Sequence, residues 1–234
     1  MLLSWTAFCL DAGQADAPWE PAGAVFAQAG QSAAGRADMP SFDGTWWSVL
    51  AVWPDEAAAA QGERDAHAAA AVRAGSAWHV GLEAVSFRGD AVLSGGARPF
   101  ASLPAAGKTR GASVVVTLAG LGPDVARTTE FFERFVALGG DVSGAPGHRA
   151  ALVQAATDGA VLTMSAWETL RDAVTWAYHQ PTHRETLRRN EEVGLVTTSG
   201  FLRCAVRTSS GRLGDRPDPL DGRTGVVVPR QEQA

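Results

Sequence analysis

Cysteine and lysine are scarce in this sequence, and isoleucine is absent. The two cysteines, Cys9 and Cys204, lie in apolar runs near opposite ends of the chain, so a CxxC motif for redox chemistry or zinc is excluded. We expect two buried, reduced thiols in place of a disulfide. Lys108 is the only lysine, while alanine, glycine and arginine are plentiful. This bias is typical of GC-rich coding and makes alanine a weak indicator of helix.

Long apolar runs and an excess of basic charge are also missing. No stretch reaches the roughly 18 apolar residues of a membrane span, and no basic region precedes the short apolar run at the N-terminus. The 20 basic and 25 acidic residues give a net charge of −5, which removes a global electrostatic argument for nucleic acid binding. A hydrophobic fraction of 46% is normal for a folded chain. We therefore expect a folded cytoplasmic protein with no transmembrane segment and no nucleic acid partner.

Two segments of the sequence are similar when they are aligned on a tryptophan. Trp46–Trp53 and Ala160–Trp167 are apolar runs of strand length that end in tryptophan. Acidic residues follow each run, and they suit the positive end of a helix dipole. A histidine comes 14 residues after the first of these tryptophans, at His67, and 16 residues after the second, at His183. The recurrence predicts a divergent internal duplication.

The beginning of each half fits one plan. Leu2–Leu10 and Ser113–Leu121 are apolar runs of strand length, each followed by a turn. In the second half, residues 125–138 place their apolar side chains mainly on one side of a helix, as in helices that cover a sheet. With a further strand over His148–Ala155, this half follows the ferredoxin-like βαββαβ plan. Gly30–Gly44 is too short and too rich in small residues to be a full equivalent of the matching part of the second half. This predicts that the first copy is shortened.

The predicted fold class is α+β, with two fused ferredoxin-like halves whose sheets pack face to face into one pseudo-symmetric barrel. We expect an N-terminal half over residues 1–100, a linker over 101–112, a C-terminal half over 113–221 and a disordered tail over 222–234. A ligand pocket is expected between sheet and helices.

Several motifs occur in the order found in a known family. They are WWSVLAVWPDE at Trp46–Glu56, the second copy around Trp167, the helix Pro181–Arg189 and GRLGDRPDPL at Gly211–Leu220. Together they resemble the spheroidene monooxygenase family over most of residues 45–100 and 113–220. That resemblance implies a duplicated dimeric α/β-barrel and a haem-containing oxygenase of acyclic carotenoids. The sequence departs from the family in its shortened start and in His148–Ala155, which is mostly small and apolar where the family has a basic strand.

His183 is the first candidate for chemistry. Pro181 favours the first turn of a helix and places His183 near its start, on the same side as Leu187. The resemblance makes it a candidate ligand for haem iron, reached from the barrel interior. The alternative is a capping or core histidine that binds only backbone. His179 has the spacing of a helical metal pair with His183, but Pro181 separates the two, and a zinc site would need a third ligand.

Arg188 and Arg189 lie on the same predicted helix and could hold haem propionates, because a guanidinium offers a paired donor fork. Their ordinary interpretation is a solvated face that pairs with nearby glutamates. Tryptophans are numerous for this length, and those near strand ends and helices would suit a pocket for a flat or long apolar ligand. Core packing explains them equally well. The tryptophans assigned to this pocket are Trp47, Trp53, Trp167 and Trp176.

Three common catalytic patterns are excluded. Ala105–Thr109 lacks the first glycine of a phosphate-binding loop, no G-x-G-x-x-G follows the first strand, and no G-x-S-x-G is present. The function that we predict is a haem-dependent monooxygenase of an apolar, carotenoid-like or polyketide-like small molecule, served by an electron donor. A cofactor-free oxygenase or cyclase of the same barrel class and a non-catalytic ligand-binding protein are the alternatives. Association of two copies is left open.

Overall fold

In the computed structural model, residues 1–10, 17–34, 45–156 and 159–229 are described. Within these ranges, the N-terminal half contributes four antiparallel strands and one helix, and its strands are ordered β4-β1-β3-β2. Its elements are β1 (Leu2–Leu10), β2 (Phe26–Ala34), β3 (Trp46–Trp53), α1 (Glu56–Arg73) and β4 (Ala74–Gly89).

The C-terminal half repeats this arrangement with more helix. Its strands are ordered β9-β6-β8-β7, so the first, second, third and fourth strands of each half occupy equivalent places. This is the strand order of a ferredoxin-like unit, and it confirms the predicted fold class. The elements are β6 (Ser113–Gly120), α2 (Val125–Ser143), β7 (His148–Ala155), β8 (Ala160–Trp167), α3 (Leu170–His179), α4 (Pro181–Val193) and β9 (Thr198–Leu213).

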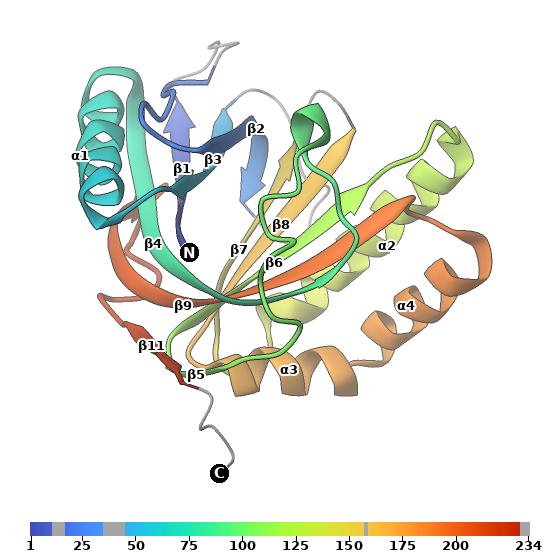
Figure 1. Ribbon diagram of the computed structural model, residues 1–234. Coiled ribbons are helices and arrows are strands. Elements are labelled where there is room, and N and C mark those ends of the chain that lie inside the picture. Colours follow the sequence, from blue (N-terminus) through green and yellow to red (C-terminus); the bar gives the residue numbers. More distant parts are fainter. Residues whose placement is uncertain (11–16, 35–44, 157–158, 230–234) are drawn as a thin grey trace.

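The two four-stranded sheets are joined along both edges. β4 pairs with β9, and β2 pairs with β7, in both cases antiparallel. The predicted barrel of two facing sheets is therefore confirmed, and pairing along the edges satisfies backbone groups that open sheet edges would leave exposed. The eight strands form a closed barrel, with helices on its outside (Figure 1).

The barrel interior is packed with apolar side chains. Alternate residues of each strand point inward, and the largest of them are at most 1% exposed. They include Trp5, Trp78, Leu82, Leu162, Met164 and Leu202. Residues on the outer face of the N-terminal strands, such as Phe8, Val49 and Trp53, form a second cluster under α1. The two hollows described below lie beside α2, α3 and α4, on the outer side of the barrel.

The connection between the halves and the C-terminal tail both contain structure. Residues 90–107 cover one part of the barrel with Ala91, Leu93 and Phe100, and include a short 3₁₀ turn at Ser94–Gly96. β5 (Lys108–Gly111) lies in the predicted linker and pairs with β11 (Gly225–Val228). The prediction of a disordered tail is therefore wrong for residues 225–228, because the β5 edge gives them backbone partners. A two-residue strand, β10 (Arg216–Pro217), pairs antiparallel with the end of β9.

The two thiols differ in exposure. Cys204 is buried, as expected, whereas Cys9 is half-buried, so the prediction of burial is wrong for Cys9. Cys9 lies next to the end of β1, where the register with β4 is irregular. Among the described helices, none is long and apolar enough to cross a membrane.

Candidate functional site

The candidate site lies on the outer side of the C-terminal half, where the ends of β7 and β8 meet α3. His148, the first residue of β7, is opposite Trp167, the last residue of β8, and their rings are 5.1 Å apart. Trp167 is 1% exposed and packs against Val142 of α2 and Ala173 of α3. No local sequence pattern indicates this pairing, because only the register of the two strands brings His148 to Trp167.

A row of aromatic rings continues from this pair to α4. Trp167 and Trp176 are 5.9 Å apart between ring centroids, and Trp176 and His183 are 5.2 Å apart. Trp176 lies on α3, which begins after Thr169, whose hydroxyl accepts a hydrogen bond from the backbone N–H of Asp172 at 3.2 Å. The row therefore joins the sheet to two successive helices through ring contacts.

His183 lies in the first turn of α4, as predicted, but not toward the barrel interior. Pro181 begins the helix, and Gly194, with a φ of +64°, ends it. α4 lies outside the barrel (Figure 1). His183 therefore contacts Trp176 on the outer side, and the expected approach from the interior is wrong. Each strand of the barrel has one face toward the interior and one face toward the helices. The sequence of a helix does not show which face of the sheet that helix packs against.

The tautomer of His183 is set by its environment. Nδ1 is 2.8 Å from the carbonyl oxygen of Ala177, and a carbonyl only accepts, so Nδ1 carries the proton. Burial lowers the pKa of His183, and the hydrogen bond to Ala177 opposes this shift. The imidazole is therefore neutral at pH 7, and Nε2 keeps its lone pair.

Three buried ring nitrogens of this region have no hydrogen-bond partner among the described residues. They are Nε2 of His148 and Nε1 of Trp167 and of Trp176. Burial lowers the pKa of His148 to about 4, against an opposing hydrogen bond to the backbone of Ala150, so this ring is also neutral. Buried N–H groups are normally paired, so two unpaired indole donors side by side indicate a place where a ligand oxygen or a water can bind.

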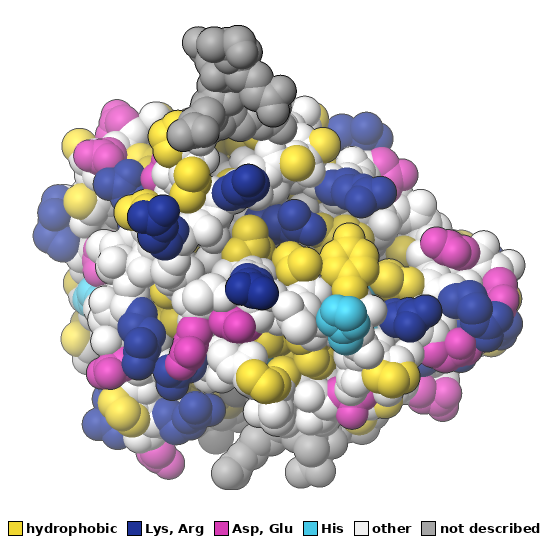
Figure 2. Space-filling view, turned by 90° about the horizontal axis from the view of Figure 1, so that it is seen from below, with side chains coloured by type: hydrophobic (Ala, Val, Ile, Leu, Met, Phe, Trp, Pro, Cys, Tyr) yellow, Lys and Arg dark blue, Asp and Glu magenta, His cyan; other side chains and the backbone are white. Residues whose placement is uncertain are grey.

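A small hollow of about 240 Å³ opens beside Trp176. It is lined by Pro146, Asp172, Thr175, Trp176, His179 and Gln180. Figure 2 shows the face on which α3 and the β5–β11 pair lie, with hydrophobic side chains gathered at its centre beside histidine and basic side chains. His179 thus lines the hollow, whereas His183 contacts it only through Trp176.

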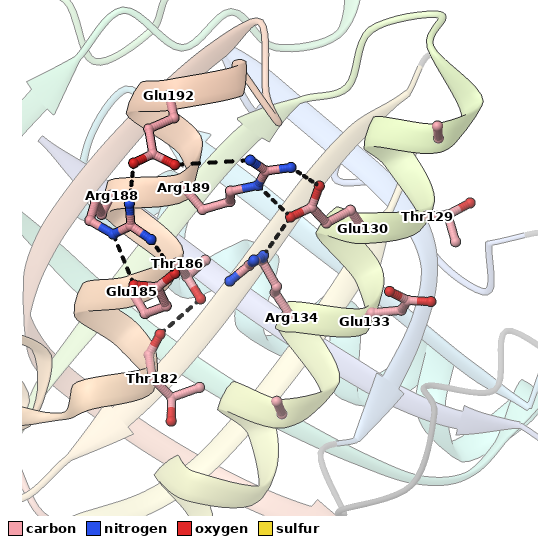
Figure 3. A pocket seen from close by; sticks show the side chains of 12 residues that line it. Thr129, Glu130, Glu133, Arg134, Thr182, Glu185, Thr186, Arg188, Arg189 and Glu192 are labelled. Carbon is pink, nitrogen blue, oxygen red and sulfur yellow. Dashed lines mark hydrogen bonds and ion pairs between the residues drawn. The ribbon is translucent and has the colours of Figure 1, made fainter.

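Arg188 and Arg189 lie in a separate groove of about 890 Å³ between α2 and α4 (Figure 3). Arg189 makes a two-pronged contact with Glu130 of α2, from Nε at 2.8 Å and Nη2 at 3.1 Å. Arg188 pairs with Glu185 and Glu192 of its own helix. The guanidinium groups of Arg189 and Arg134 lower the pKa of Glu130 to about 2. These arginines therefore already bind carboxylates of the chain, in a groove that His183 does not line.

The four tryptophans assigned to one pocket belong to two halves of the molecule. Trp167 and Trp176 are in the site just described, but Trp47 and Trp53 pack under α1. Trp53 is buried, and its Nε1 donates to Oγ of Ser4 at 3.0 Å. A single tryptophan-lined pocket is therefore wrong, because the duplication places equivalent strand ends in different halves of the barrel.

Comparisons with known proteins give similarity of structure alone. No family model matches the sequence, and no curated protein matches it. One similar solved structure is a candidate monooxygenase of Fusobacterium nucleatum, with 8% identity, 98% of each chain covered and a TM-score of 0.41. An aldoxime dehydratase has 12% identity over 96% of this chain and 83% of that one, with a TM-score of 0.49. An anthrone oxidase-like protein has 14% identity over 90% and 92%, with a TM-score of 0.33.

The class of this protein follows from its own topology. Two ferredoxin-like halves, fused in one chain and paired along both edges, make an α+β protein of the dimeric α/β-barrel type. Identities of 8 to 14% assign no role to any residue of this chain.

Proposed function

We propose that this protein is an oxygenase that acts on an apolar small molecule at the outer side of its C-terminal half. Its sequence resemblance to the spheroidene monooxygenase family supports this assignment, and so does the row of aromatic rings beside a hollow. The substrate class that we propose is carotenoid-like or polyketide-like, since indole rings offer broad apolar contact with N–H donors at their edges.

The observation that carries the proposal is the state of His183. Histidines that bind a metal through Nε2 usually donate their Nδ1–H to a carbonyl, which fixes the tautomer and the ring plane. His183 does this with Ala177 at 2.8 Å, and its lowered pKa keeps Nε2 unprotonated. Its donor chemistry therefore fits a ligand of haem iron.

We propose haem as the cofactor, with His183 as its iron ligand. Haem, when bound, supplies the oxygen chemistry that side chains do not perform alone. The chain's own contribution is to hold the imidazole neutral and oriented, through Ala177 and the ring of Trp176. Arg188 and Arg189 fit propionates poorly, because both are engaged with glutamates.

Titration of the purified protein with haem tests this assignment. We expect a Soret band that shifts on binding, and we expect His183→Ala to lose it while remaining folded. His179→Ala is the matched control, because His179 is four residues away and lines the hollow, and it should keep the wild-type spectrum. Failure of the wild type to take up haem, or an unchanged spectrum in His183→Ala, would remove the assignment.

The unpaired N–H of Trp176 favours a second candidate, a cofactor-free oxygenase or cyclase. Trp176 lines the hollow, and its buried Nε1 has no partner among the described residues, so a substrate oxygen that enters from the hollow would give this N–H a partner. Oxygen uptake with an electron-rich polycyclic phenol and no added cofactor would be the expected activity. Trp176→Phe keeps an aromatic ring and removes the donor, so it should lower this activity at least tenfold. Binding of the phenol without turnover in the wild type would instead identify a ligand-binding protein.

A further inference from the structure

A few polar side chains occur inside the barrel, among mostly apolar residues. Gln28 of β2, Ser48 of β3 and Gln154 of β7 are each at most 2% exposed. Gln28 is paired with Leu50, and Gln154 with Leu162, and both leucines belong to the interior core. Paired residues of neighbouring strands share a face, so both amides point inward. Ser48 shares the inward face of Leu50, two residues along β3.

Gln154 brings these side chains together across strands. Its Nε2 donates to the carbonyl oxygen of Ser48 at 2.7 Å and to that of Gln28 at 3.1 Å. Glycine at position 30 leaves the room for this reach, because a Cβ there would lie 2.8 Å from Cγ of Gln154. Since Nε2 faces two acceptors, the orientation of the Gln154 amide is determined, and Oε1 points elsewhere.

The amide of Gln28 is oriented as well. Its Oε1 accepts a hydrogen bond from the backbone N–H of Ser94 at 3.2 Å. Ser94 belongs to the segment 90–107, which packs apolar side chains against the interior core. Gln28 therefore ties this covering segment to the barrel wall and directs its Nε2 into the interior.

Three polar groups of these side chains then have no hydrogen-bond partner among the described residues. They are Nε2 of Gln28, Oγ of Ser48 and Oε1 of Gln154. An unpaired buried polar group is costly, and native proteins contain few of them. Nε2 can only donate, Oε1 can only accept, and a hydroxyl can do both. One water molecule has the groups to accept from Nε2 of Gln28, to donate to Oε1 of Gln154 and to form a hydrogen bond with Oγ of Ser48.

We propose that the barrel interior contains a water-binding site between Gln28, Ser48 and Gln154. A buried water of this kind makes about three hydrogen bonds to groups that would otherwise be unpaired. This site lies on the inner face of the sheet, whereas His183 and Trp176 lie on the outer side. It is therefore independent of the proposed function.

The stability of Ser48→Ala tests the proposal. If water occupies the site, the substitution removes a hydrogen bond to that water, and the urea midpoint falls. If the interior is dry, the substitution removes an unpaired buried hydroxyl, and the midpoint stays the same or rises, which would overturn the proposal. Ser32→Ala is the matched control: Ser32 is 1% exposed in β2 and donates to the carbonyl of Val153, so its loss should lower the midpoint in either case.

A second measurement reads the water directly. Oxygen-17 magnetic relaxation of the wild type should show a long-lived internal water, and Gln154→Met should reduce that signal. Methionine keeps the length of glutamine and removes both of its polar atoms, so the variant separates loss of the site from loss of volume. A relaxation signal that is the same in wild type and variant would contradict the proposed location.

Discussion

Gly62 illustrates how a single atom can matter in this protein. It is a buried residue of α1, and a Cβ at this position would overlap the indole of Trp53. Replacing glycine by alanine inside a helix usually stabilises a protein by about 0.5 to 1 kcal/mol. At Gly62, the overlap reverses the sign, and we expect Gly62→Ala to lower the free energy of unfolding by about 1 to 3 kcal/mol.

Gly139→Ala in α2 is the matched control for that experiment. A Cβ at position 139 has nothing within 4 Å, so this variant should gain stability. Urea denaturation of both variants measures the two effects. Equal shifts for Gly62→Ala and Gly139→Ala would show that Trp53 does not press on α1.

The thiols give a second prediction at this scale. Cys204 is fully buried, and burial raises the pKa of its thiol, so the reactive thiolate is suppressed. Cys9 is half-buried. We expect a thiol reagent to label Cys9 in the native protein and to label Cys204 only after denaturant is added. Rapid native labelling in a Cys9→Ser variant would contradict the buried position of Cys204.

The residue that precedes α2, Asp124, makes a local hydrogen bond at the start of this helix. The carboxylate of Asp124 accepts from the backbone N–H of Arg127 at 3.1 Å, which caps the helix. Asp124→Ala should therefore cost about 0.5 to 2 kcal/mol of stability, whereas Asp124→Asn keeps a capping oxygen and should cost less. Chemical denaturation of the two variants is the measurement. If Asp124→Ala and Asp124→Asn lose the same stability, the effect comes from the lost negative charge and not from the lost capping hydrogen bond.

The whole molecule should lose stability as the pH falls below neutrality. Burial, and then the charge of His67, lower the pKa of His79 to about 3, and burial lowers that of His148 to about 4. The unfolded chain binds protons at these imidazoles near pH 6.5, and the folded chain does not. Stability is therefore greatest above pH 6.5 and falls toward pH 4, by on the order of 1 to 2 kcal/mol per pH unit.

Denaturation midpoints between pH 7 and pH 5 measure this effect. His79→Gln retains a group that can bind Thr6, whose hydroxyl is 2.8 Å from Nδ1 of His79, and it should flatten the pH dependence by about one proton. The lowered pKa values of carboxylates such as Glu130 and Asp218 change the stability only at lower pH, so they do not affect the measurement between pH 7 and pH 5. A stability that is constant from pH 7 to pH 5 would show that the two imidazoles are accessible to protons.

The duplication and its strands were predictable because they are local properties of the sequence. Tryptophan-ended apolar runs became β3 and β8, and the small apolar segment His148–Ala155 became β7. Strand length, apolar content and the residues that begin a helix are readable within a short window. The α+β class with two similar halves follows from those windows and their order.

The faces and edges of these strands were decided only by the tertiary structure. In β1, residues Leu3 to Phe8 are all buried, because one face meets the interior and the other meets α1. Alternation of polar and apolar residues therefore disappears, and the sequence cannot say which tryptophans point to which side. Pairing of β4 with β9, and of β2 with β7, joins residues more than 100 positions apart. That closure placed His183 outside the barrel, separated Trp53 from Trp167, and brought Gln28 and Gln154 together in the interior.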